Sequence, residues 1–244
     1  MRLSIAESVL EVPEEDWARI AGGESPFIQF PFLASLERSG SVGDGTGWLP
    51  RFVLAWDGDR LVGALPAYLK GHSYGEYIFD WAWAEGAERA GLRYYPKAVV
   101  AVPFTPATDR RILLHSDASD EVGPALVQRL RDLALELGLS SLHWLFVTAE
   151  EKALLASLGH LPRTTVQYHW SNRGWSSFED YLGAMRGKRR REIRRERRRL
   201  AESGIRVEML SGSELGDEEW SAIDRFYRST AARKWGHPYL TPSF

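Results

Sequence analysis

The sequence predicts a mixed α/β (α+β) fold spread over two domains, and three observations support this. The chain has 244 residues, which is long for one mixed domain and comfortable for two small ones. Its first part contains short alternating segments typical of antiparallel strands, interspersed with segments of helical spacing. Beyond residue 170 the character changes, so we expect domains of residues 1–170 and 171–244.

In residues 1–170, strands and helices alternate, and local signals mark several of their ends. Asp57-Gly58-Asp59 is typical of a turn between two strands, and Gly138 follows an apolar helical stripe. Thr148 and Glu151 have the spacing of a capping box. The expected elements are strands at 3–5, 51–56, 60–70, 74–83, 97–102, 111–115, 142–147 and 164–170, and helices at 13–20, 32–39, 122–137 and 149–158.

The second part opens with a long helix. Ser177 is suited to cap it, and Gly204 to end it after about residue 203. A strand at 205–210 and a helix at 217–234 follow.

Composition excludes several classes of protein. Hydrophobic residues make up 44% and charged residues 26% of the chain, which is typical of a globular protein without a membrane span. There is no cysteine, hence no disulfide or thiolate site, and the six histidines are scattered, so we expect no metal. Glu7 and Glu11 do not fit a signal peptide, which makes the cytoplasm the expected compartment.

Charge is distributed unevenly. Residues 186–199 hold ten Lys or Arg and two Glu, whereas the net charge of the whole chain is −2. Guanidinium groups bind phosphate oxygens well, so tRNA, a nucleotide or an anionic lipid are candidate partners. The alternative is a solvated helix neutralised by acidic neighbours. The candidate phosphate-binding residues are Lys188, Arg189, Arg190 and Arg194.

Two glycine-rich motifs are interpreted as turns. Gly71-His72-Ser73-Tyr74-Gly75 matches the G-x-S-x-G pattern of hydrolases, but an alternating aromatic segment follows it in place of a helix. Residues 43–47 suggest a phosphate loop, but no Gly-Lys-Ser/Thr completes it.

Glu76 and Asp80 are the candidate catalytic residues. On a strand over 74–83 they project to one face about 13–14 Å apart, too far to share a proton. Either one is a candidate general base for an attacking amine, directly or through a water. The alternative is that both decorate a solvent-exposed face.

Aromatic residues crowd around these acids, which suits either a ligand cleft or an ordinary core. The candidate substrate-binding residues are Tyr74, Trp81, Trp83 and Lys97, with Lys234 and Tyr239 as weaker candidates.

Three resemblances to known families follow from these segments. The order of elements in residues 1–170 resembles that of the GNAT N-acyltransferase fold. Three segments, 73–84, 95–106 and 233–240, together resemble the FemAB-like family of predicted N-acyltransferases, often labelled peptidoglycan biosynthesis/recognition proteins. The basic segment 188–199 also resembles a basic helix in the second domain of FemAB-type aminoacyltransferases.

The resemblance implies two tandem GNAT-like domains, the first complete and the second partial because the chain is truncated relative to the family. It implies transfer of an acyl or aminoacyl group from acyl-CoA or aminoacyl-tRNA to an amine, such as one on a cell-envelope precursor. The turn where GNAT domains bind the acyl-CoA pyrophosphate corresponds here to 116–121, which is acidic, so we expect no working acyl-CoA site in the first domain. The alternative function is a non-catalytic module that binds an anionic ligand.

Overall fold

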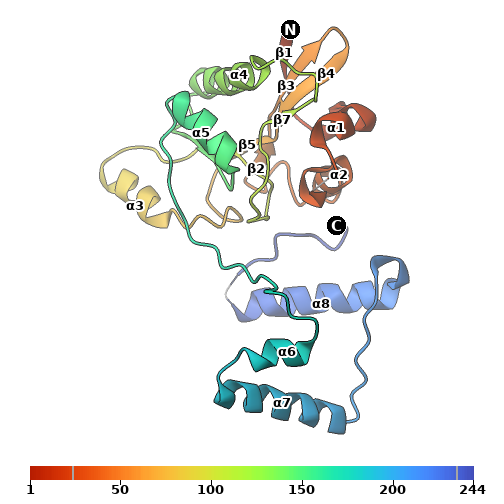
Figure 1. Cartoon of the computed structure of the whole chain (residues 1–244). Coiled ribbons are helices and arrows are strands. Elements are labelled where there is room, and N and C mark those ends of the chain that lie inside the picture. Colours follow the sequence, from red (N-terminus) through yellow and green to blue (C-terminus); the bar gives the residue numbers. More distant parts are fainter. Residues whose placement is uncertain (24, 235) are drawn as a thin grey trace. The chain divides into compact units, whose positions relative to one another are not determined.

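A computed structural model of the chain describes residues 1–23, 25–234 and 236–244. It contains two compact units, the first made of residues 1–164 and 230–244 and the second of residues 165–229. Each is described by itself below, with the elements labelled as in Figure 1.

Within the described residues, the first unit contains two four-stranded sheets. One has the order β1-β3-β4-β7, all antiparallel, and the other the order β2-β5-β6-β8, in which β6 and β8 are parallel. The strands are β1 (Arg2–Ala6), β2 (Trp48–Pro50), β3 (Phe52–Asp57), β4 (Arg60–Leu65), β5 (Ala67–Lys70), β6 (Lys97–Val100), β7 (Leu113–Leu114) and β8 (Leu142–Trp144).

Helices cover both faces of the first sheet, and its central strands are therefore buried on both sides. Phe52 and Leu54 of β3 belong to a core shared with α1 and α2, whereas the alternate residues Val53 and Ala55 belong to a core shared with α4. The helices of this unit are α1 (Glu14–Ala21), α2 (Phe30–Arg38), α3 (Trp81–Arg89), α4 (Val122–Glu136) and α5 (Ala149–Ser157).

The described part of the second unit is helical. Its elements are α6 (Phe178–Gly183), α7 (Gly187–Glu202), a short 3-10 turn at Gly212–Glu214 and most of α8 (Asp217–Arg233). Ser177 and Asp180 form a capping box at the start of α6. A hydrogen-bonded ion pair from Arg194 of α7 to Glu179 joins α7 to α6, and Leu182 of α6 is fully buried.

The predicted mixed α/β class is confirmed, and most elements lie near their expected positions. The predicted capping box at the start of α5 is confirmed. The Thr148 side chain accepts the backbone N–H of Glu151, and the Glu151 side chain accepts the backbone N–H of Thr148. The predicted strand over 60–70 is divided at Pro66, which has no N–H to donate to a ladder.

Four of the expected elements are wrong. Residues 164–170 and 205–210 are irregular rather than strands, because no described neighbouring strand offers them a ladder. The helix expected over 177–203 is broken near Arg186, whose backbone is extended, into α6 and α7. Residues 74–83 form a loop and the start of α3 in place of a strand.

The C-terminal segment packs on the first unit. Thr241 donates its backbone N–H to Ser41 Oγ at 3.1 Å and its hydroxyl to the carbonyl of Ser39 at 2.8 Å. Phe244 contacts Phe32 edge-on, with ring centroids 5.8 Å apart. The segment therefore belongs to this unit although it comes last in the chain.

Candidate functional site

The centre of the candidate site is the ammonium group of Lys97, which is fully buried. Its Nζ donates to Glu76 Oε2 at 2.8 Å, to Asp80 Oδ2 at 2.7 Å and to Ser73 Oγ at 2.9 Å. Tyr94 also donates its hydroxyl to Asp80 Oδ2 at 2.5 Å. One lysine thus holds two carboxylates that have no exposed side-chain surface.

Strand pairing explains why acids gather here. Lys70 ends β5, Lys97 begins β6, and the two are partners in the antiparallel register. Partners across a ladder share a face, and like charges in such a pair destabilise the sheet. The loop that leaves β5 brings Glu76 and Asp80 back over this pair, so that two buried lysines face two buried acids.

The backbone of this loop turns its acids inward and its aromatics outward. Tyr77 and Phe79 adopt left-handed backbone angles, with φ of 59° and 52°. Left-handed backbone at a bulky residue costs about 1–3 kcal/mol and persists only where surrounding contacts enforce it. The inference from strand spacing, that the two acids lie about 13–14 Å apart on one face, is therefore wrong. The alternative of a solvent-exposed face is wrong as well, because both acids are buried.

The two carboxylates have different proton affinities. Burial raises the pKa of Glu76 above its ordinary value, and Lys97 and Lys70 oppose this only in part. Burial acts in the same direction on Asp80, but hydrogen bonds from Lys97, Tyr94 and Ser73 outweigh it and lower its pKa to about 2. Glu76 is therefore the better proton acceptor of the two near neutral pH.

One oxygen of each acid has no hydrogen-bond partner within the described residues. These atoms are Glu76 Oε1 and Asp80 Oδ1, both buried. Buried carboxylate oxygens are normally satisfied by a protein group, water or ligand. They are thus the two acceptor atoms that this centre leaves available.

Lys70 is the second lysine of the centre. Its Nζ lies 3.7 Å from the centroid of the Trp48 ring and donates to the carbonyl of Tyr74 at 3.2 Å. Burial lowers the pKa of Lys70 to about 7, although Glu76 pulls it upward. Burial, together with the charge of Lys97, lowers the pKa of His143 on the neighbouring β8 to about 4.

The predicted aromatic residues surround the acids but lie on the surface. Tyr74, Trp81 and Trp83 are all exposed, and the Tyr74 and Trp81 rings contact each other with centroids 4.9 Å apart. Tyr239 stacks on Phe104, with centroids 5.0 Å apart and planes within 7°. Its ring centroid also lies 6.2 Å from that of Tyr77.

Two predicted substrate-binding residues have other surroundings. Lys97 holds the two carboxylates and has no exposed side-chain surface. Lys234 is exposed just beyond α8 and does not join the centre. Trp235, part of the motif that carries the family resemblance, lies outside the described residues.

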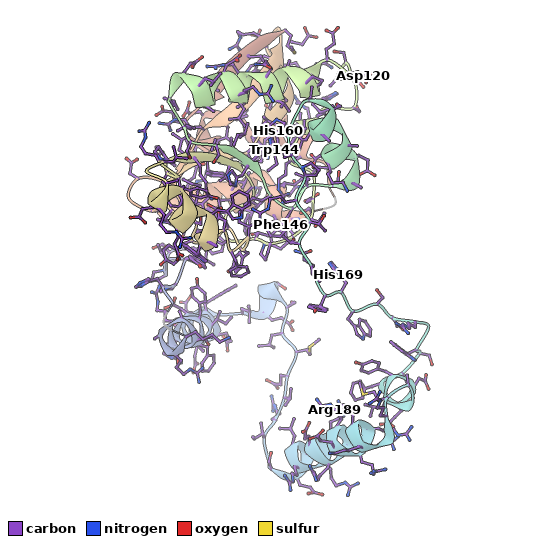
Figure 2. The ribbon with its side chains drawn as sticks, turned by 90° about the vertical axis from the view of Figure 1, so that its left-hand side faces the viewer. Asp120, Trp144, Phe146, His160, His169 and Arg189 are labelled. Carbon is purple, nitrogen blue, oxygen red and sulfur yellow. The ribbon has the colours of Figure 1, made fainter. Side chains whose placement is uncertain are left out.

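The four predicted phosphate-binding residues lie on α7 in the second unit, and Figure 2 shows Arg189 on this helix. Arg189 donates to Glu192 at 2.7 Å, Arg194 donates to Glu179 at 3.1 Å, and Arg190 contacts the carbonyl of Gly183. Lys188 is the only one of the four without an intramolecular partner within the described residues.

Sequence reasoning missed Lys70 and Ser73. The available signal was that one lysine ends the strand over 60–70 and another begins the next strand. Two buried lysines in such positions need acidic side chains nearby to balance their charge. The register that makes them partners follows only from the sheet.

The start of α4 is acidic, as the sequence indicated. Glu121 precedes this helix without a side-chain cap, and Asp117 and Asp120 are exposed before it, Asp120 being labelled in Figure 2. No group of His, Asp or Glu that suits a metal ion occurs within the described residues. In the same part of the chain, no helix is long and apolar enough to cross a membrane.

The fold and this centre define the protein as a mixed α/β protein with a buried lysine–dicarboxylate site. Residues 8–244 match the model of the FemAB-like family, described as peptidoglycan biosynthesis/recognition. The chain belongs to this family, and the resemblance drawn from its motifs is confirmed. A search of curated proteins found no match.

Three solved structures resemble the chain at low identity. They are an aminoglycoside 6′-N-acetyltransferase from Acinetobacter haemolyticus (14% identity, 70% of this chain and 99% of that one, TM-score 0.42), a ribosomal-protein-alanine N-acetyltransferase from Brucella melitensis biovar Abortus 2308 (15%, 70% and 100%, 0.42) and a transcriptional regulator from Bacillus halodurans C-125 (16%, 69% and 100%, 0.41). With TM-scores below 0.5, these likenesses support no conclusion about this chain.

Proposed function

We propose that this protein is an N-acyltransferase that acylates an amine on a cell-envelope precursor. The observation that carries the proposal is Glu76, a buried acid with a raised pKa and one oxygen without a partner. Membership of a peptidoglycan-related family supports the class of acceptor. The donor is acyl-CoA or an aminoacyl-tRNA, and either would bring phosphate groups.

Glu76 serves as the general base in this proposal. The acceptor nitrogen attacks the donor carbonyl, a C–N bond forms, and the bond from the acyl carbon to the thiol or ribose oxygen breaks. The proton lost by the nitrogen passes to Glu76 Oε1, directly or through a water, and then to the departing sulfur or ribose oxygen, which leaves as a thiol or hydroxyl. Asp80 keeps its charge and holds Lys97, because its pKa is far below neutral.

The test is acyl transfer to an amine-bearing muropeptide, with acetyl-CoA and with an aminoacyl-tRNA as donors. Glu76→Gln keeps the size of the side chain but accepts no proton, so we expect the turnover rate to fall by about 10²–10⁴-fold. The wild-type rate should also rise with pH as Glu76 loses its proton, and the variant should lack this rise.

Glu88→Gln is the control, because Glu88 is an exposed glutamate of the nearby helix α3. Its rate should match that of the wild type. A Glu76→Gln variant that is folded and fully active would exclude Glu76 as the base.

A second candidate function is a module that binds an anionic ligand, and α7 favours it. Arg191, Arg195, Arg198 and Arg199 join Lys188 in having no intramolecular partner within the described residues. At 3.6 residues per turn these five cations share one side of α7.

A further inference from the structure

The segment that carries the buried carboxylates also carries exposed aromatic side chains. These are Tyr74, Tyr77, Phe79, Trp81 and Trp83, here named the aromatic ridge. All five are exposed, from 38% for Trp81 to 76% for Phe79. The rings of Tyr74 and Trp81 contact each other. Exposed apolar side chains gathered in this way mark binding surfaces.

The ridge is held in place from beneath. Glu76 and Asp80 alternate with its aromatics along the chain and are bound to Lys97, while Trp48 Nε1 donates to the carbonyl of Tyr74 at 3.1 Å. Acidic side chains are buried and aromatic ones exposed, which reverses the usual arrangement. A segment built in this way presents rigid aromatic faces to whatever binds there.

Its composition argues against a membrane and against a second copy of the chain. The exposed charges of α3 and the segment after it, Glu85, Glu88, Arg89 and Arg93, cancel, and Arg163 against Trp83 adds a single cation, whereas attraction to anionic lipid needs a cluster of Lys and Arg. Ile78, the large aliphatic residue of the segment, packs inward on the core. Among the described residues 74–83, no large aliphatic side chain is therefore exposed to build a core-like interface.

A saccharide fits these features. A pyranose ring offers C–H groups on its faces and hydroxyls at its edge, so it packs on aromatic faces and hydrogen-bonds to polar tips such as tyrosine hydroxyls. Arg163, whose guanidinium carbon lies 4.8 Å from the centroid of the Trp83 ring, adds donors at one end.

We propose that the aromatic ridge binds the saccharide part of the acceptor and so presents the acceptor's amine to the carboxylates beneath. This inference rests on the proposed function for the identity of the acceptor. It adds a saccharide-binding surface and names the side chains that form it.

The test is a calorimetric titration of the full chain with the β-1,4-linked tetramer of N-acetylglucosamine, without any acyl donor. We expect saturable binding that Trp83→Ala weakens about tenfold or more. Phe79→Ala should weaken it as well. Trp220→Ala is the matched control, because Trp220 is 53% exposed, close to the 59% of Trp83, but lies on α8. It should bind like the wild type, and the melting temperature should confirm that each variant is folded.

Three results would overturn the proposal. The first is no saturable binding of the tetramer by the wild type, and the second is an equal loss in Trp220→Ala. The third is that Trp83→Ala instead abolishes binding to phosphatidylglycerol vesicles or dissociates a dimer. Transfer to a small amine without sugar, measured separately, tests the proposed function alone. Intact transfer without saccharide binding would therefore exclude only the ridge.

Discussion

At Lys97, a single ammonium group compensates two buried carboxylates. Removing one partner of a buried ion pair is far more costly than removing an exposed pair, because a charge is left without compensation in the interior. The same residue anchors the loop that carries Glu76 and Asp80. Its contribution is therefore to position the candidate base and the ridge above it.

We expect Lys97→Met to lower the free energy of unfolding by about 3–5 kcal/mol, the usual cost of breaking a buried pair. Guanidinium denaturation monitored by circular dichroism measures this. Adding Glu76→Gln and Asp80→Asn removes the uncompensated charges, so part of the loss should return. Purely additive losses in the triple variant would show that the three residues do not interact.

Lys70 makes stability depend on pH. Its pKa is about 7 in the folded chain and about 10.4 in an unfolded one, so between these values the unfolded state binds more protons. Stability from this residue therefore rises as pH increases from about 7 towards 10, and does not change below 7.

Lys70→Met removes this titration. We expect the wild type to gain unfolding free energy relative to the variant as the pH rises from 7 to 9.5. Denaturation curves at intervals of half a pH unit measure the difference. A difference that stays constant over this range would mean that Lys70 is not buried as a neutral amine.

At the scale of elements, Glu151 joins α5 to the segment before β7. Its Oε1 accepts the backbone N–H groups of Arg111 and Ile112, both at 2.6 Å, while Oε2 caps the helix at Thr148. One side chain thus satisfies donors from two elements far apart in the chain. Arg111, fully buried, reinforces the junction by donating to the carbonyls of Leu145 and Ala107.

Glu151→Ala leaves two buried N–H groups without acceptors, which should lower the free energy of unfolding by about 2–4 kcal/mol. Glu150→Ala is the control, because Glu150 is the preceding residue on the same helix but is exposed. Chemical denaturation of both variants checks this. Equal effects of the two changes would mean that Glu151 acts only through helix propensity.

At the scale of the whole molecule, the charge of the chain is divided between an acidic remainder and one basic helix. Within the described residues, the unpaired cations of α7 lie on one side, while Arg189 and Arg194 are hydrogen-bonded to glutamates. A side of a helix that carries five cations, none paired with an acid, is suited to bind a row of phosphate groups such as a nucleic-acid backbone.

We expect the full chain to bind single-stranded poly(U) with an affinity that falls steeply with salt. The double change Arg191→Gln and Arg195→Gln should reduce the log–log salt slope by about 1.4, or about 0.7 for each phosphate contact. Arg189→Gln with Arg194→Gln is the matched control and should reduce it less. Fluorescence anisotropy from 50 to 300 mM salt measures the slopes, and equal slopes in both variants would contradict the assignment.

The sequence alone determined the features that depend on local signals. The helix from Glu14, the capping box at Thr148 and the turn at Gly58 were predictable, since each depends on residues within one turn or hairpin. The family followed from three short motifs, and Glu76 and Asp80 could be named as candidate acids. The basic helix was visible from composition, although its division at Arg186 was not.

Only the tertiary structure decided how the site is built. The alternation in residues 74–83 has the period of a strand, but two left-handed residues and the pull of Lys97 form a loop with its acids inside. The pairing of Lys70 with Lys97 depends on the register of two strands separated by 26 residues. Local sequence carries no information about such distant partners. The free energy of burying the two lysines with the two acids depends on those distant partners. The buried centre is therefore visible only in the folded chain.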